Sequence, residues 1–116
     1  MHWHAYTHTG QMPKDNEARN PQAPVPPTVI SHWFRKPQSM RAGTFTDPEQ
    51  TFAWLEKEIR ATPPRDPDGL LEHLRDCVDR HAGAYAGYWH ASGTQMVTRC
   101  ALACPREGER CPAPPP

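Results

Sequence analysis

Cysteine and histidine side chains, which can ligate metal ions, occur near both ends of this sequence. Cys100, Cys104 and Cys111 fall in the stretch TRCALACPREGERC. On an extended strand Cys100 and Cys104 point to the same side, but about 13 Å separates their sulfur atoms. Two thiolates that bind one zinc ion must lie within about 4 Å of each other. These two cysteines therefore do not share a metal if the strand continues through Cys104.

Cys104 and Cys111 form the better metal-binding pair. Pro105 ends the strand, and the REGE loop that follows can return Cys111 to Cys104. Such a loop would form half of a zinc site, which Cys77 or His90 would complete. The spacing C-x3-C-x6-C differs from the C-x2-C of common zinc knuckles, however. We therefore favour buried thiols without a metal, and keep a zinc site on Cys104 and Cys111 as the alternative.

Three histidines near the start of the chain are a second candidate for metal binding. His2, His4 and His8 project from the same side if the N-terminus is extended. A His-x-His pair on a strand can bind zinc through neutral imidazoles. Enzymes with such a pair take further ligands from a larger scaffold, and this sequence shows no obvious set. We interpret these histidines as the polar face of an edge strand or as a frayed terminus.

No pattern typical of an active site stands out in the sequence. Ser92 lies close to His90 but outside a G-x-S-x-G context. Arg106 could lower the pKa of the Cys104 thiol, yet no positioned base is evident. P-loop and Rossmann glycine patterns are missing. The sequence therefore favours a non-enzymatic binding protein, with an enzyme as the minority interpretation.

Composition limits the class of protein. A chain of 116 residues has room for one domain, and its formal net charge is zero, unlike a typical nucleic-acid-binding domain. No apolar run approaches the roughly 20 residues of a membrane-spanning helix, and the first residues do not resemble a signal peptide. We therefore expect no membrane contact and a cytoplasmic location. Arginine outnumbers lysine ten to three, which suggests a high-GC, bacterial coding sequence.

Two helices are predicted by their start and stop signals. Asp47 is a good N-cap, Pro48 suits the first helical position, and Pro63 ends the run. The second helix begins in the same way at Asp66 and stops before Gly83. Because only a few residues join the two helices, we expect them to pack as neighbours.

Strands are predicted from β-branched and aromatic residues and from turn signals. The hairpin is the clearest, with arms at 84–91 and 95–103 and with Gly93 in a turn that permits a positive φ. Further strands are expected at residues 1–10, 28–36 and 40–46. The domain organisation follows: a possible N-terminal strand (1–10), a proline-rich polar linker (11–27), one α+β domain (28–105) and a proline-rich tail (106–116).

The expected fold class is α+β, a small and mostly antiparallel sheet with two sequential helices on one face and a C-terminal β-hairpin. The other face of the sheet would then expose aromatic rings beside arginines. We expect this uncovered face to bind another protein or a second copy of the chain. The residues expected to make contact are Trp33, Arg35, Tyr88, His90 and Arg99.

Three other interpretations remain open at this point. A nucleic-acid-binding accessory protein would use the same aromatic residues together with Lys36 and Arg41, because bases stack on rings. A zinc-stabilised binding module would be built on Cys104 and Cys111. In the third interpretation, the face of the sheet opposite the helices is not exposed, because either the N-terminal segment or a second copy of the chain packs against it.

Overall fold

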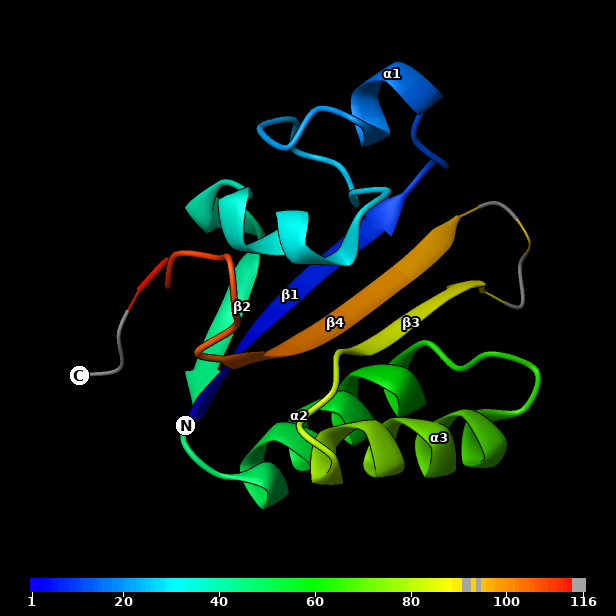
Figure 1. Cartoon of the computed structure of the whole chain (residues 1–116). Coiled ribbons are helices and arrows are strands. Elements are labelled where there is room, and N and C mark those ends of the chain that lie inside the picture. The colour runs from blue at the N-terminus through cyan, green and yellow to red at the C-terminus, as the bar shows by residue number, and fades with distance from the viewer. Residues whose placement is uncertain (91–92, 94, 114–116) are drawn as a thin grey trace.

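A computed structural model of the chain describes residues 1–90, 93 and 95–113. Its centre is a four-stranded antiparallel sheet in the order β2-β1-β4-β3 (Figure 1). The strands are β1 (His2–Gly10), β2 (Arg41–Phe45), β3 (Ala84–Trp89) and β4 (Met96–Cys104). The helices are α1 (Asp15–Ala18), α2 (Pro48–Ala61) and α3 (Pro67–Asp79), with 3-10 turns η1 (Ile30–Arg35) and η2 (Gln38–Met40). The predicted α+β class is confirmed.

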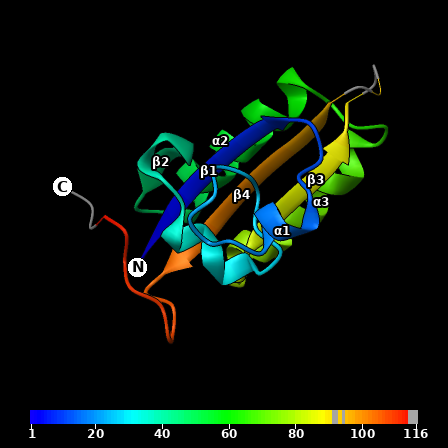
Figure 2. The same ribbon diagram turned by 90° about the horizontal axis from the view of Figure 1, so that it is seen from above.

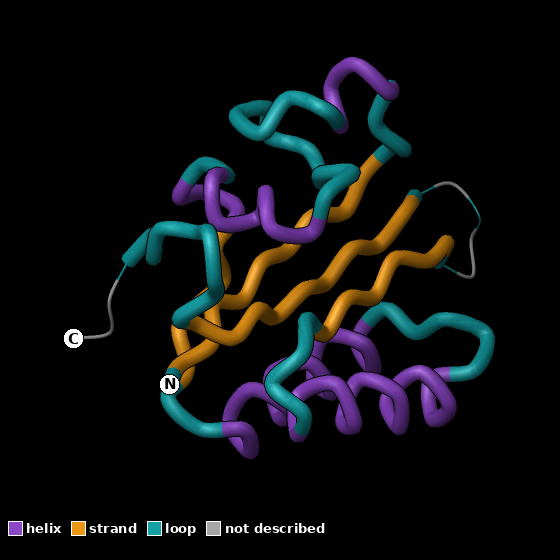
Figure 3. Tube along the Cα trace, in the orientation of Figure 1, coloured by secondary structure: helices purple, strands orange, loops and turns teal. Residues whose placement is uncertain are grey.

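Helices α2 and α3 begin where their caps predict. The Asp47 carboxylate accepts a hydrogen bond from the backbone N–H of Gln50, and Asp66 does the same for Gly69. Both helices pack on one face of the sheet (Figure 3). Their buried residues meet small side chains of β3 and β4, and this cluster comprises Leu55, Ile59, Leu71, Leu74, Val78, Ala84, Ala86 and Ala101. The small alanines let the helices approach the sheet closely.

The C-terminal hairpin is also confirmed. β3 pairs with β4 in unbroken antiparallel register from Ala84↔Ala101 to Trp89↔Met96. Gly93 in the turn has a φ of 77°, the left-handed conformation that glycine adopts at little cost. Ser92 and Thr94 of the predicted turn lie outside the described residues.

The strand predicted over residues 28–36 is wrong, because this segment contains the 3-10 turn η1. Trp33 and Phe34 are neighbours in sequence and both are buried. On a strand these two side chains would point to opposite faces. The helical turn directs both toward the sheet, so tertiary packing overrides the β propensity of TVISHWF.

The expectation of an uncovered sheet face is also wrong. Residues 11–40, including α1, η1 and η2, lie over the face opposite α2 and α3 (Figure 2). Trp33 packs on Tyr6 with 5.3 Å between ring centroids. The buried cluster on this face comprises Tyr6, Trp33, Phe34, Met40, Cys100, Leu102 and Cys104. The N-terminal segment therefore covers the face of the sheet that α2 and α3 leave uncovered.

A buried lysine holds this irregular cover together. Lys36 Nζ donates hydrogen bonds to the backbone oxygens of Asn20 (3.2 Å) and Ala23 (2.7 Å). Burial lowers the pKa of Lys36. The segment predicted as a linker (11–27) is thus fixed to η1 by a side chain rather than by a strand.

Replacing Trp33 should test whether η1 packs against the sheet. Trp33 is 1% exposed and Trp89 is 48% exposed. We expect Trp33→Ala to lower the free energy of unfolding by about 3–5 kcal/mol, and Trp89→Ala to change it by less than about 0.5 kcal/mol. Urea unfolding followed by circular dichroism at low protein concentration measures both. Equal losses for the two variants would contradict the packing of η1 on the sheet.

Candidate metal centre

Four side chains that can ligate a metal meet where β1 begins and β4 ends. They are His2, His4, Cys104 and Cys111, and one ligand atom from each lies within 4.8 Å of all the others. Cys104 and His4 are buried, whereas His2 and Cys111 are partly exposed. The residues come from opposite ends of the chain, and the fold alone brings them together.

The sheet register places three of the four ligands. His2 and His4 point to the same side because side chains alternate along β1. In the antiparallel pairing of β1 with β4, His2 lies directly opposite Cys104. Side chains of such directly opposed residues are neighbours, with β-carbons about 5 Å apart.

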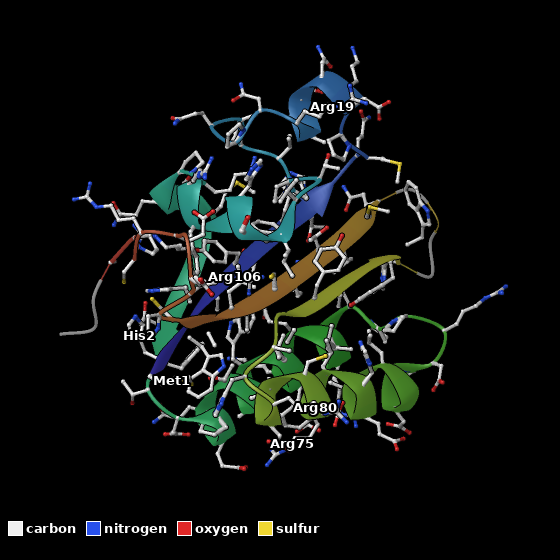
Figure 4. The ribbon with its side chains drawn as sticks, viewed as in Figure 1. Met1, His2, Arg19, Arg75, Arg80 and Arg106 are labelled. Atoms are coloured by element: carbon white, nitrogen blue, oxygen red, sulfur yellow. The ribbon has the colours of Figure 1, made fainter. Side chains whose placement is uncertain are left out.

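The segment after β4 supplies the fourth ligand. The chain reverses after Pro105 and returns Cys111 to the start of β1, and Figure 4 shows His2 beside this segment. Arg35 of η1 helps to hold the loop through an ion pair with Glu109 at 3.2 Å. The return of Cys111 to Cys104 is the loop geometry that the sequence suggested.

The distances between ligand atoms match those of a tetrahedral zinc site. With Zn–N near 2.05 Å and Zn–S near 2.3 Å, a regular tetrahedron has N···N edges of about 3.3 Å and N···S edges of about 3.6 Å. The His2 and His4 Nε2 atoms are 3.1 Å apart. Cys111 Sγ lies 3.5 Å from His2 Nε2 and 3.4 Å from His4 Nε2. A single ion can therefore contact these three atoms at normal bond lengths.

Hydrogen bonding alone does not explain this close group of atoms. The His2 nitrogen, the His4 nitrogen and the Cys111 sulfur form a nearly equilateral triangle. Each imidazole Nε2 carries either one proton or one lone pair, so it can donate or accept but not both, and hydrogen bonds cannot run along all three sides of such a triangle. Lone pairs on these three atoms would face one another and repel. A cation between the three atoms would instead attract all of them.

Thr44 on β2 orients one of the ligands. His4 Nδ1 lies 3.2 Å from the Thr44 hydroxyl oxygen. When Nδ1–H donates to that oxygen, Nε2 carries the free lone pair and faces the other ligands. Metal-bound histidines commonly use their second ring nitrogen in this way.

Burial sets the protonation of the two inner ligands. Desolvation, followed by the charges of His2 and Arg41, lowers the pKa of His4 to about 4, so its imidazole is neutral near pH 7. Desolvation and the adjacent Cys111 thiol raise the pKa of Cys104 to about 11. Without a metal Cys104 is therefore a neutral thiol, and a bound cation would displace its proton.

Other cysteines and histidines considered as ligands lie elsewhere among the described residues. Cys100 is buried beneath η1 and is not in the group with Cys104, as expected for a strand that continues through Cys104. Cys77 on α3 is 3.6 Å from His73. His8 and His90 do not belong to the group. The cysteine pair of the alternative interpretation thus belongs to this group, and the histidines beside it are His2 and His4 rather than His90.

The five residues predicted to form a binding surface do not share one face. Trp33 is buried under the N-terminal cover, and Arg35 is exposed beside Glu109. Arg99 is buried on the helical side, where it forms an ion pair with Glu58 and donates to the His8 carbonyl. Tyr88 also faces the helices and donates to the Thr62 carbonyl, whereas His90 follows the end of β3.

Residues predicted to contact nucleic acid have roles inside the fold. Lys36 is buried and bonded to backbone carbonyls. Arg41 lies opposite Tyr6 in the β1–β2 register and is half-buried. Among the described residues, no helix combines the length and apolar character required to cross a lipid bilayer.

Comparison with protein-family models, with curated proteins and with solved structures finds no match to this chain. What the site can do is therefore inferred from its geometry and chemistry.

Removing the Thr44 hydroxyl should weaken metal binding without removing a ligand. We expect Thr44→Val to lower zinc affinity by about 10–100-fold, because His4 loses the partner that fixes its ring. Thr44→Ser keeps the hydroxyl and should bind as the wild type does. Competition with a chromophoric chelator measures all three proteins. An unchanged affinity in Thr44→Val would show that Thr44 does not orient His4.

Proposed function

We propose that the protein is a zinc-stabilised binding module in which His2, His4, Cys104 and Cys111 hold one zinc ion. The observation that carries this proposal is that the distances among His2 Nε2, His4 Nε2 and Cys111 Sγ match the edges of a zinc tetrahedron, with a Cys104 ligand atom within 4.8 Å of the other three. Two imidazoles with two thiolates form one of the common ligand sets of structural zinc. Two thiolates also balance the charge of the ion in a partly buried site.

A single metal fits this ligand set better than an iron–sulfur cluster does. In a [2Fe–2S] centre with two histidines, both histidines bind one iron and both cysteines bind the other. That division separates the nitrogen pair from the sulfur pair. Here Cys111 Sγ is as close to both imidazole nitrogens as ligands of one ion would be. Tetrahedral S2N2 coordination without a cluster favours zinc.

The metal would act as a crosslink between the two ends of the chain. Cys111 lies in an irregular segment after β4, which includes few hydrogen bonds besides the Arg35–Glu109 pair and a turn from Glu109 to Arg106. A zinc ion would fasten this segment to β1. Four protein ligands leave no open position for a substrate or an activated water, so the site supports a structural rather than a catalytic role.

Metal analysis tests the proposal directly. Protein purified without chelator should contain about one zinc per chain, because all four ligands bind one ion. Cys104→Ser/Cys111→Ser should reduce the zinc content to less than a tenth of an equivalent. The matched control is Cys77→Ser, which removes a partly exposed cysteine away from the site and should retain the metal. Less than a tenth of an equivalent in the wild type, even after refolding with zinc, would contradict the proposal.

Chelation should also show that the metal stabilises the fold. If free zinc exceeds the dissociation constant a thousandfold, the bound ion contributes about 4 kcal/mol, equivalent to roughly 10–15 °C in Tm. Treatment with a strong chelator should lower Tm by about that amount, and added zinc should restore it. His2→Gln/His4→Gln should show no such response, whereas His73→Gln on the exposed side of α3 should respond like the wild type. Cobalt in place of zinc should give absorption bands typical of tetrahedral thiolate coordination.

A further inference from the structure

Strand β3 forms one edge of the sheet and has a partner on one side only. It pairs with β4, and no other strand of the described residues lies beyond it (Figure 1). Among the hydrogen bonds of the described residues, none joins the outer side of β3 to another backbone group. Its outward N–H and C=O groups are therefore free to pair with an added strand.

The register identifies which backbone groups point outward. His90 N–H donates to the Gln95 carbonyl at 3.1 Å, so this pair directs its hydrogen bonds toward β4. Residues along an antiparallel strand alternate between directing these groups toward one neighbour and toward the other. Tyr85, Gly87 and Trp89 therefore direct their N–H and C=O groups away from β4.

The same three residues are exposed. Tyr85 is 43% exposed and Trp89 is 48% exposed, and Gly87 between them is exposed as well. The strand contains no charged residue, no proline and no irregularity in its register, which are common protections of an edge. The opposite edge, β2, carries Arg41, and its pairing with β1 shifts between Ala5 and Tyr6.

Apolar surface continues beside this edge. Tyr85 forms a shallow cavity of about 240 Å3 with residues of the N-terminal cover and of β4, among them Met12, Pro26, Pro27 and Met96. Met12 is itself 59% exposed. Any strand added to β3 therefore lies against apolar side chains as well as free backbone groups.

We propose that this edge binds the β3 strand of a second copy of the chain. The two strands would run antiparallel about a two-fold axis at Gly87, to give a continuous eight-stranded sheet. Gly87 would then oppose Gly87 of the second copy, and Tyr85 would oppose Trp89 of the second copy. The outward groups of the three residues would form six backbone hydrogen bonds, two for each of three opposed pairs.

The order Tyr-x-Gly-x-Trp makes β3 complementary to itself. A two-fold axis at the glycine pairs each tyrosine with a tryptophan, and opposed aromatic residues are among the favourable cross-strand pairs. Glycine at the axis leaves room there, because the Tyr85 hydroxyl occupies the space that a β-carbon on Gly87 would need. An unrelated strand would need matching residues of its own, whereas a second copy always supplies them.

Self-association through β3 does not depend on the proposed zinc site. The four ligands lie on β1, β4 and the following segment, and none lies on β3. Loss of zinc could therefore leave the dimer intact, and loss of the dimer could leave zinc bound. The two proposals fail independently.

Sedimentation equilibrium over about 5–500 μM protein is the first test, since interfaces of modest area associate weakly. The wild type should approach the mass of a dimer as its concentration rises. Trp89→Lys should weaken association at least tenfold, because an ammonium group would lie opposite Tyr85. The matched control, Gln38→Lys, adds the same charge on the exposed turn η2 and should associate as the wild type does. A monomer throughout this range, or equal association of wild type and Trp89→Lys, would overturn the proposal.

Cysteine crosslinking tests the register itself. In a Cys77→Ser/Tyr85→Phe background loaded with zinc, which lacks the hydroxyl that would meet a β-carbon at position 87, Gly87→Cys should form an intermolecular disulfide in oxidised glutathione, because α-carbons of such an opposed pair lie about 5.5 Å apart. Tyr85→Cys should not crosslink to its own copy, since the two residues would be about 14 Å apart along the strands. Crosslinking at 85 but not at 87 would overturn the register. Circular dichroism and zinc content should match the wild type in each variant compared.

Discussion

The pairing of β1 with β4 is the contact on which the rest of the structure depends. Nine residue pairs join the first strand of the chain to the last, from His2↔Cys104 to Gly10↔Met96. Because side chains alternate, this register assigns Trp3 and Ala5 to the helical side and His2, His4 and Tyr6 to the other. A slip of one residue would reverse both assignments and separate the histidines from Cys104.

The two faces of the sheet are covered by different kinds of structure. On one face two capped helices satisfy their own backbone hydrogen bonds and press apolar residues onto small alanines. On the other face short turns and loops cover large aromatic side chains, with few backbone hydrogen bonds of their own. Such a cover needs attachments from side chains. Lys36 is one attachment, and a zinc ion held by His2, His4, Cys104 and Cys111 would supply another.

The sequence predicted correctly those helices and turns whose position depends on residues only a few positions away. Asp47, Asp66 and Gly93 mark the helix starts and the hairpin turn because each acts on residues within a few positions. The segment around Trp33 was not predictable in this way, since its helical turn depends on a sheet face that needs covering. The candidate metal ligands present the same difficulty, because His2 and Cys111 lie far apart in the sequence. The clue available in the sequence was a His-x-His strand long enough to pair with the whole second arm of the hairpin.

The open edge of β3 and the candidate metal centre would form different kinds of contact: the first between two chains, the second within one chain. Zinc would attach the irregular segment after β4 to strand β1. All four of its ligands would come from the same chain. The edge of β3 presents ordered backbone groups that no segment of the described chain satisfies. Since the edge and the ligand cluster lie on different strands, each subunit of a β3-paired dimer keeps a complete set of ligands. Pairing of the two β3 strands would therefore join two subunits that each have a complete metal site. The spacing of Tyr85, Gly87 and Trp89 would make a second copy the preferred partner strand.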